Sequence, residues 1–137
     1  MAAPVKVFVP RETSALSMGA DEVAAKILAR AKDNETSSDK FELVRNGSWG
    51  MSWLEPLVEV ETGGQRIAYG PVTPDDVDSL FAAGLLAGKD HPLCQGPTRE
   101  IPYLAKQDRW TFRRCGLIDP LSLGDYQANG GFAGLKK

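Results

Sequence analysis

The chain has 137 residues, of which 42% are hydrophobic and 25% are charged, and its formal net charge is −2. These values are typical of average globular proteins and argue against a disordered, fibrous or membrane class. The 16 basic and 18 acidic residues are scattered along the chain, so no basic stripe exists to neutralise phosphates. Nucleic acid is therefore not an expected partner, and the length suits one domain with a tail.

The sequence shows no targeting pattern and no complete set of metal ligands. Its apolar runs are well short of the roughly 20 residues that cross a bilayer, and its first residues lack the pattern of a signal peptide. We therefore expect a cytoplasmic protein without membrane contact. Cys94 and Cys115 form no close pair, and His91 is the only histidine, so the four ligands of a structural zinc site are not present. A disulfide is not expected in a reducing compartment.

The first third of the chain predicts a strand, a helix and a second strand. Val5, Val7 and Val9 alternate with other residues at period two, which predicts a strand that proline closes. After a turn-like stretch, residues 21–33 place their apolar side chains along one helical face, with acidic residues in the first turn. Residues 41–45 return to the period of a strand.

Two more strands and a second helix follow. Residues 57–61 and 66–69 flank a Thr-Gly-Gly turn and predict an antiparallel hairpin. Thr73 is a suitable N-cap, and the proline after it suits the first helical position. A glycine, Gly84 or Gly88, is expected to end this helix.

The predicted fold class is α/β, with a four-stranded mixed sheet and two helices in residues 1–88. The element order is the thioredoxin-like pattern, although periodicity alone does not separate it from other small α/β folds.

Residues 89–137 differ in character and predict an extended arm that has little contact with the first domain. The arm begins rich in proline and turn residues, and Trp110 and Phe112 then alternate with other residues as in a strand. Asp119 and the proline after it predict a helix that ends at Gly130. The last residues begin another helix without a partner for its apolar face, so we expect the chain to be cut from a longer protein.

The stretches GSWGMSWLEPLVEV and YGPVTPDDVDSLF resemble the closing loop, strands and helix of thioredoxin-like 2Fe–2S ferredoxins. In that family the cluster is held by a C-x-x-x-x-C pair and a C-x-x-x-C pair, and the matching positions here are Pro10, Ala15, Ser48 and Ser52. Proline and alanine offer no donor atom, and a serine hydroxyl is a poor ligand for iron–sulfur units. The resemblance therefore implies a ferredoxin domain without its cluster. We expect each serine hydroxyl to face water or to find a hydrogen-bond partner.

The loop that replaces the second cysteine pair has two interpretations. It is a tight surface loop, but it also carries Trp49, Met51 and Trp53, which are residue types enriched at protein interfaces. These three residues are a candidate docking surface, or alternatively a cover over the local core. Thioredoxin-like folds often have a cis bond ahead of their third strand, so the Glu55–Pro56 peptide is predicted to be cis.

Residues 91–137 are similar to the leading segment of the complex I family of NADH-binding flavoproteins, where R-x-x-x-R-x-C-G-x-I-D-P precedes G-G-[FY]. A clusterless ferredoxin domain fused to that segment resembles the beta subunit of soluble NAD-dependent formate dehydrogenases. The resemblance implies that later residues of the full subunit bind FMN, NAD(H) and a 4Fe–4S cluster. It also implies two partners, an alpha subunit with a molybdenum or tungsten centre and a gamma 2Fe–2S subunit.

The 137 residues themselves carry no catalytic motif. Asp75, Asp76 and Asp78 lie in the first turns of a helix, where the helix dipole already explains them. A C-x-x-C pair, a G-x-S-x-G turn and a P-loop are all missing from the sequence. We expect a non-catalytic structural and docking part that holds no cofactor or metal of its own. Two alternatives stay open, a diaphorase subunit of an NAD-linked hydrogenase and a free-standing clusterless interaction module.

Overall fold

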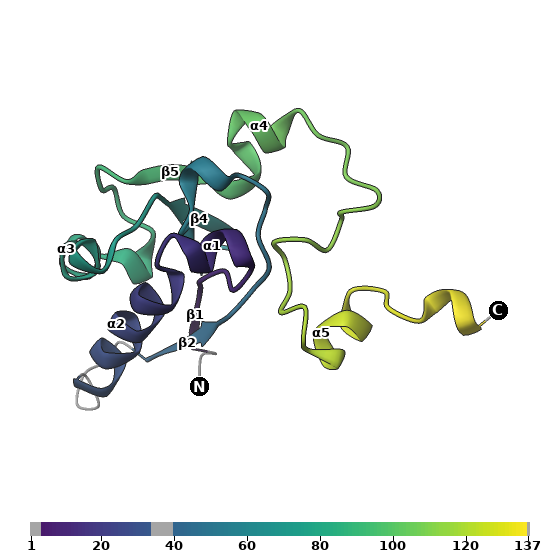
Figure 1. The fold of residues 1–137 in the computed structure, drawn as a ribbon, viewed down its shortest axis with the longest axis horizontal. Coiled ribbons are helices and arrows are strands. Elements are labelled where there is room, and N and C mark those ends of the chain that lie inside the picture. Colours follow the sequence, from purple (N-terminus) through teal and green to yellow (C-terminus); the bar gives the residue numbers. More distant parts are fainter. Residues whose placement is uncertain (1–3, 34–39, 137) are drawn as a thin grey trace.

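A mixed sheet of five strands, in the order β2-β1-β3-β4-β5, is the centre of the fold (Figure 1). The computed structural model describes residues 4–33 and 40–136. The strands are β1 (Val5–Phe8), β2 (Phe41–Val44), β3 (Val58–Thr62), β4 (Gln65–Tyr69) and β5 (Cys94–Pro97). β1 and β2 are parallel, whereas the other neighbouring strands are antiparallel.

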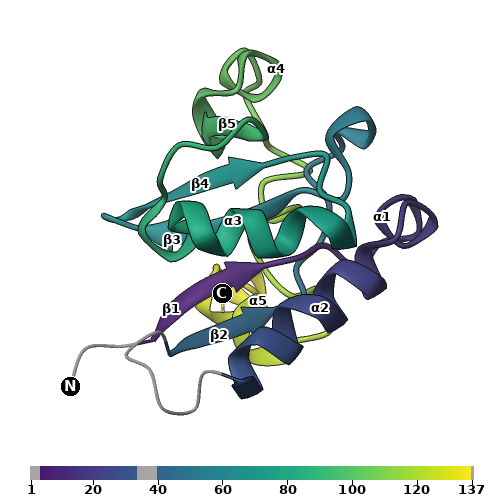
Figure 2. The same ribbon diagram turned by 90° about the vertical axis from the view of Figure 1, so that its left-hand side faces the viewer.

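Two helices cover one face of this sheet. They are α2 (Ala20–Asp33) and α3 (Val77–Ala83), and both lie in front of the sheet in Figure 2. The shorter helices are α1 (Thr13–Ser17), α4 (Pro102–Ala105) and α5 (Leu123–Ala128). Short 3-10 turns are η1 (Ser52–Leu54), η2 (Pro74–Asp76), η3 (Leu85–Ala87), η4 (Thr98–Glu100) and η5 (Ala133–Lys136). No helix in the described ranges is long and apolar enough to span a membrane.

The main core fills the space between the sheet and the two long helices. The pleat of a strand turns every second side chain toward the same face, so β1, β3 and β4 each present apolar residues to the helices. The sheet side consists of Val7, Val9, Val58, Val60, Ile67 and Tyr69, and the helix side includes Val23, Ile27, Val77 and Leu80. Each such side chain contributes about 1.5 to 3 kcal/mol when it is buried, so this core is the main source of stability.

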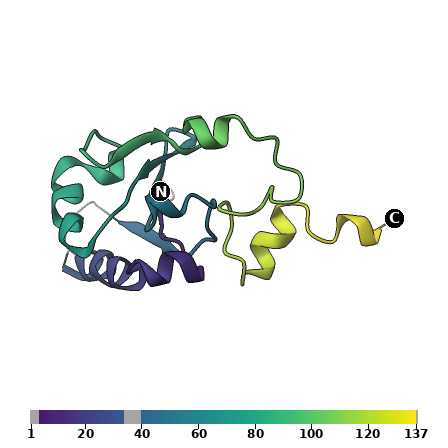
Figure 3. The same ribbon diagram turned by 45° about the horizontal axis from the view of Figure 1, so that its top comes forward.

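The opposite face of the sheet carries a smaller apolar cluster and no long helix. Its buried members are Trp49, Met51, Leu57, Ala68, Ile101 and Leu104. The loop after β2 and the chain after β5 cover this face in place of a helix. Beyond α4, residues 106–136 form a tail that loops away from the sheet, returns to it at Gly116 and Leu117, and ends in α5 and η5 (Figure 3).

Much of the first domain forms as predicted. The β3–β4 hairpin is antiparallel, with Val60 opposite Ile67, and β1 and α2 occupy their predicted positions. The Glu55–Pro56 peptide is cis, as predicted, and so is Gly70–Pro71.

The prediction of an arm with little contact to the domain is wrong. β5 belongs to the arm and pairs with β4, with Ala68 opposite Gly96, so the sheet has five strands instead of four. β5 has the sequence CQGP, in which glycine and proline hide the alternation that marks a strand. The long-range pairing with β4 therefore decides the conformation of this segment.

Three local details also differ from the expectation. The turn-like stretch before the first long helix forms α1. The residues around Trp110 and Phe112 form bends and turns instead of a strand. The last full helix begins later than Asp119, because Ser122 is its N-cap and accepts a hydrogen bond from the backbone N–H of Asp125 at 3.1 Å.

The helical segment containing α3 begins after the predicted N-cap Thr73, and bonds to Asp76 that the sequence did not predict fix this start. The Asp76 carboxylate accepts hydrogen bonds from the backbone N–H and the hydroxyl of Thr73, at 2.8 and 2.6 Å. These two bonds lower the pKa of Asp76. Gly84 ends α3 in the left-handed conformation, with φ of 95°.

We expect Asp76→Ala to lower the free energy of unfolding by about 1 kcal/mol, because the helix start loses its cap. A lowered pKa means that this contribution is present above the unfolded value of 3.8 and is lost as the pH falls through the folded value. Urea unfolding at about pH 7 and about pH 3 should show the difference from wild type shrinking in acid. The exposed neighbour Asp75 gives the control Asp75→Ala, and an equal loss in both variants would contradict the capping role.

Candidate functional site

The candidate site lies where β1 and β2 end and the chain enters two loops. The backbone N–H of Val9 donates to Val44, and that of Arg11 donates to Asn46, both at 3.0 Å, so the two loops run side by side. Arg45 adds a hydrogen bond from its Nε to the Val9 carbonyl at 3.1 Å. The four positions that the sequence identifies as lost cluster ligands lie on these loops, on α1 and at the start of η1.

The structure brings only two of these four positions together. Pro10 and Ser48 are buried and line one narrow hollow that has no space for a water molecule. Ala15 is fully buried in the main core, whereas Ser52 is exposed. The space between the two loops is therefore filled by the chain itself.

Ser48 is held by its own hydrogen bonds within this hollow. Its hydroxyl donates to the Glu55 carboxylate and accepts from the backbone N–H of Gly50 at 2.9 Å. Since Ser52 faces solvent, the prediction that each serine finds a partner or water is confirmed. Burial raises the pKa of Glu55. The hydrogen bond from Ser48 acts in the opposite direction and lowers it.

The most heavily bonded group of the site is the Glu59 carboxylate, in the middle of β3. It is fully buried and accepts hydrogen bonds from Asn46 Nδ2 at 3.1 Å, Trp49 Nε1 at 2.9 Å and Thr98 Oγ1 at 2.8 Å. Arg66 on β4 lies 3.6 Å away as its ion-pair partner. Loss of water raises the pKa of Glu59, while Arg66 and the three donors act in the opposite direction. We call these five residues the Glu59 network.

The Glu59 network also fixes the point where the tail meets the sheet. The carbonyl of Gly116 accepts from Asn46 Nδ2 at 2.8 Å and from Arg66 at 2.9 Å, and Arg66 donates a second bond to the Leu117 carbonyl at 2.6 Å. The guanidinium of Arg66 lies 3.5 Å from the ring centroid of Phe8. One partly buried arginine therefore joins β1, β3 and the tail.

The ring of Trp49 packs directly against this point. Gly116 has φ of +84°, and a side chain there would place its Cβ 2.3 Å from the Trp49 ring. Only glycine fits, because both the backbone conformation and the close approach exclude a Cβ.

The residues around the hollow do not suit an iron–sulfur cluster. Such clusters are held by cysteine thiolates, and Cys94 and Cys115 do not line the hollow. Within residues 4–33 and 40–136, no group of three or more His, Cys, Asp or Glu side chains could hold a metal ion. The polar side chains at the hollow offer oxygen and nitrogen atoms and no thiolate; Ser48 bonds to Glu55, while Asn46 Oδ1 and one oxygen of Glu55 are buried without a hydrogen-bond partner.

The three residues of the candidate docking surface have different environments. Trp49 and Met51 are 5% and 1% exposed and belong to the smaller core, so they cover the sheet. Trp53 is 56% exposed and meets Tyr103 edge to face, with 4.9 Å between the ring centroids. A docking role stays a prediction for Trp53.

Solved structures of thioredoxin-like [2Fe–2S] ferredoxins from Aquifex aeolicus are similar to this chain. One superposes with a TM-score of 0.59 at 22% identity and covers 71% of this chain and 94% of its own. A second wild-type structure has a TM-score of 0.56 at 22% identity, covering 68% and 97%. A cysteine-to-serine variant has a TM-score of 0.56 at 24% identity, covering 66% and 96%. No family model and no curated protein matches the sequence.

The chain has the thioredoxin-like ferredoxin fold. The similarity extends over more than nine-tenths of each of these ferredoxins, so the shared part is a whole ferredoxin domain. The four lost ligand positions, Pro10, Ala15, Ser48 and Ser52, come from the sequence alignment, and their ferredoxin equivalence stays a prediction.

Sequence reasoning missed the Glu59 network. Glu59 occupies the polar position of an alternating strand, which normally faces water when one face of a sheet is buried. Its three hydrogen-bond donors are 10, 13 and 39 residues away along the chain. No local pattern links such distant residues.

We expect Glu59→Ala to lower the free energy of unfolding by about 3 kcal/mol, because it leaves Arg66 without its buried carboxylate and three donors without an acceptor. Denaturant unfolding measures the change. Glu61→Ala on the same strand is the matched control, since Glu61 is exposed and its loss should cost less than about 0.5 kcal/mol. A loss of similar size in both variants would show that the network contributes little.

Gly116→Ala is expected to release the start of the tail from the sheet, because its Cβ collides with the Trp49 ring and strains the backbone. Trypsin should then cleave after Arg113 or Arg114 faster than in wild type. Gly134→Ala is the control, since a Cβ at Gly134 meets nothing within 4 Å. Equal cleavage rates in the three proteins would contradict the tight contact at Trp49.

Proposed function

We propose that the chain is the amino-terminal region of the NADH-binding flavoprotein subunit of a soluble, cytoplasmic NAD-dependent formate dehydrogenase. In this role the ferredoxin-fold domain carries no cluster and serves as a structural and docking part. The parent complex converts formate to carbon dioxide, a proton and two electrons, and the two electrons with one proton reduce NAD+ to NADH. FMN in the rest of the subunit would supply the electron transfer to NAD+.

The observation that carries the docking role is the apolar surface of the tail. Trp110 and Leu135 are each 81% exposed, Leu121 is 73% exposed, and Phe112 and Leu123 are 63% and 61% exposed. Exposed apolar residues gathered on one segment mark protein contact surfaces. The tail also contains the R-x-x-x-R-x-C-G-x-I-D-P motif on which the flavoprotein resemblance rests.

The lack of a cluster in the domain is supported by the chemistry of the hollow. Proline, alanine and serine occupy the four aligned positions, and Ser48 already exchanges hydrogen bonds with its own loop. A domain without redox chemistry of its own can still place and orient the neighbouring flavin region. The Glu59 network joins the domain to the tail, so the domain has a fixed orientation relative to the tail.

The 137-residue chain, reconstituted anaerobically with iron and sulfide, is expected to hold no cluster and to bind neither FMN nor NADH. Visible absorption and flavin fluorescence measure both outcomes. Cys94 and Cys115 supply at most two thiolates, and four are required. A chain extended through the proposed flavin region should bind FMN and oxidise NADH. Iron–sulfur absorption from the 137-residue chain would refute the clusterless domain, and an extended chain without flavin would refute the flavoprotein assignment.

A further inference from the structure

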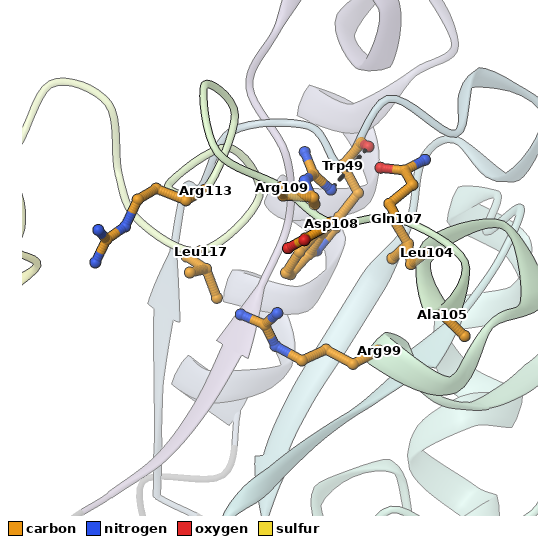
Figure 4. A pocket seen from close by; sticks show the side chains of 9 residues that line it. All are labelled: Trp49, Arg99, Leu104, Ala105, Gln107, Asp108, Arg109, Arg113 and Leu117. Carbon is orange, nitrogen blue, oxygen red and sulfur yellow. Dashed lines mark hydrogen bonds between the residues drawn. The ribbon is translucent and has the colours of Figure 1, made fainter.

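A pocket of about 480 Å³ lies between the Trp49 loop and the chain that follows β5 (Figure 4). Its lining includes Arg99, Arg109 and Arg113, together with Trp49, Asp108 and Leu117. We call it the arginine pocket. Its volume is in the range of sites that bind small molecules or side chains of a partner.

The arginine pocket is positive on a chain whose formal net charge is −2. The lining residues include three arginines and one acidic residue, Asp108, and a guanidinium stays charged in proteins. None of the ion pairs found among the described residues involves Arg99, Arg109 or Arg113. The pocket therefore has charge available for an acidic group from outside.

Two of the guanidinium groups are held in place by the Glu59 network. Arg99 and Arg109 lie 5.6 and 5.2 Å from the Trp49 ring centroid, and the Trp49 ring is fixed by its bond to Glu59. Arg109 also donates to the Trp49 carbonyl at 3.5 Å, while its Nε is buried without a hydrogen-bond partner. A buried donor of this kind is costly unless an acceptor reaches it.

Three exposed aromatic residues are sequence neighbours of lining residues. Tyr103 precedes Leu104, Trp110 follows Arg109 and Phe112 precedes Arg113, and these aromatic residues are 46%, 81% and 63% exposed. Arginine, tryptophan and tyrosine are the residue types that dominate binding energy at protein interfaces. The surface around the pocket thus has the composition of a protein contact.

The orientation of the arginines favours an extended ligand. In Figure 4 the guanidinium of Arg99 points toward the middle of the pocket, whereas that of Arg113 points away from it. The guanidinium groups therefore do not all converge on one point, and an extended peptide can present a separate acidic side chain to each arginine that it reaches.

We propose that the arginine pocket binds an acidic segment of a partner protein, with carboxylates on Arg99 and Arg109 and apolar side chains beside Trp110. This inference rests on the proposed docking function and identifies the chemistry of the partner. Asp108 limits the affinity, because its carboxylate repels the incoming acid.

The test is a fluorescence anisotropy titration of the chain with a labelled peptide of alternating glutamate and leucine, and with a matched glutamine and leucine peptide. The glutamate peptide should bind and the glutamine peptide should not. Arg99→Gln and Arg109→Gln should each weaken binding about tenfold, and Asp108→Asn should tighten it. Arg11→Gln is the control, since Arg11 is exposed and lies outside the pocket.

Two results would overturn the inference. One is equal binding of the glutamate peptide to Arg99→Gln, Arg109→Gln and Arg11→Gln, with unfolding temperatures matching wild type. The other is tight binding of inorganic phosphate, lost in the same variants, without binding of the peptide, which would assign the pocket to a phosphate ligand. The flavoprotein assignment is tested separately, because FMN binding by the extended chain does not depend on the peptide titration.

Discussion

The buried carboxylate of Glu59 is the interaction on which the second face of the sheet depends. A carboxylate without water is tolerated only when several donors surround it, and here the donors come from the loop after β2, from β4 and from the chain after β5. No long helix covers this face, so polar bonds replace much of the apolar packing that a helix would provide. The loop after β2, the chain after β5 and the tail therefore meet around one charged group.

Contacts of the chain itself also connect the loops after β1 and β2. A cluster in a small domain joins loops that have few contacts of their own, as other structural metal sites do. In this chain the loops after β1 and β2 are joined by backbone bonds, by Arg45 and by the pair of Ser48 with Glu55. These hydrogen bonds hold the two loops side by side at the hollow.

The sequence predicts those parts of the fold whose causes are local. Alternating valines define β1, and Thr73, the proline after it and Gly84 define the limits of the segment with α3, because a cap and a left-handed glycine act within a few residues. β5 has no such local cause, since its conformation comes from pairing with β4 across more than twenty residues. In the sequence, Glu59 has the pattern of a solvent-facing strand residue. Only the fold brings the distant Thr98 and the tail against it.

The tail is fixed to the sheet at Gly116, whereas its large apolar side chains are exposed. This combination suits docking. Gly116 is fixed by two donors and by the Trp49 ring, so the direction in which the tail leaves the sheet is set before any partner binds. A preorganised segment loses less conformational entropy on association than a free one, which leaves more of the apolar contact energy for affinity. The same buried carboxylate holds Trp49 and through it orients Arg99 and Arg109. The Glu59 network thus contacts both the tail, at Gly116, and the Trp49 ring that lines the arginine pocket.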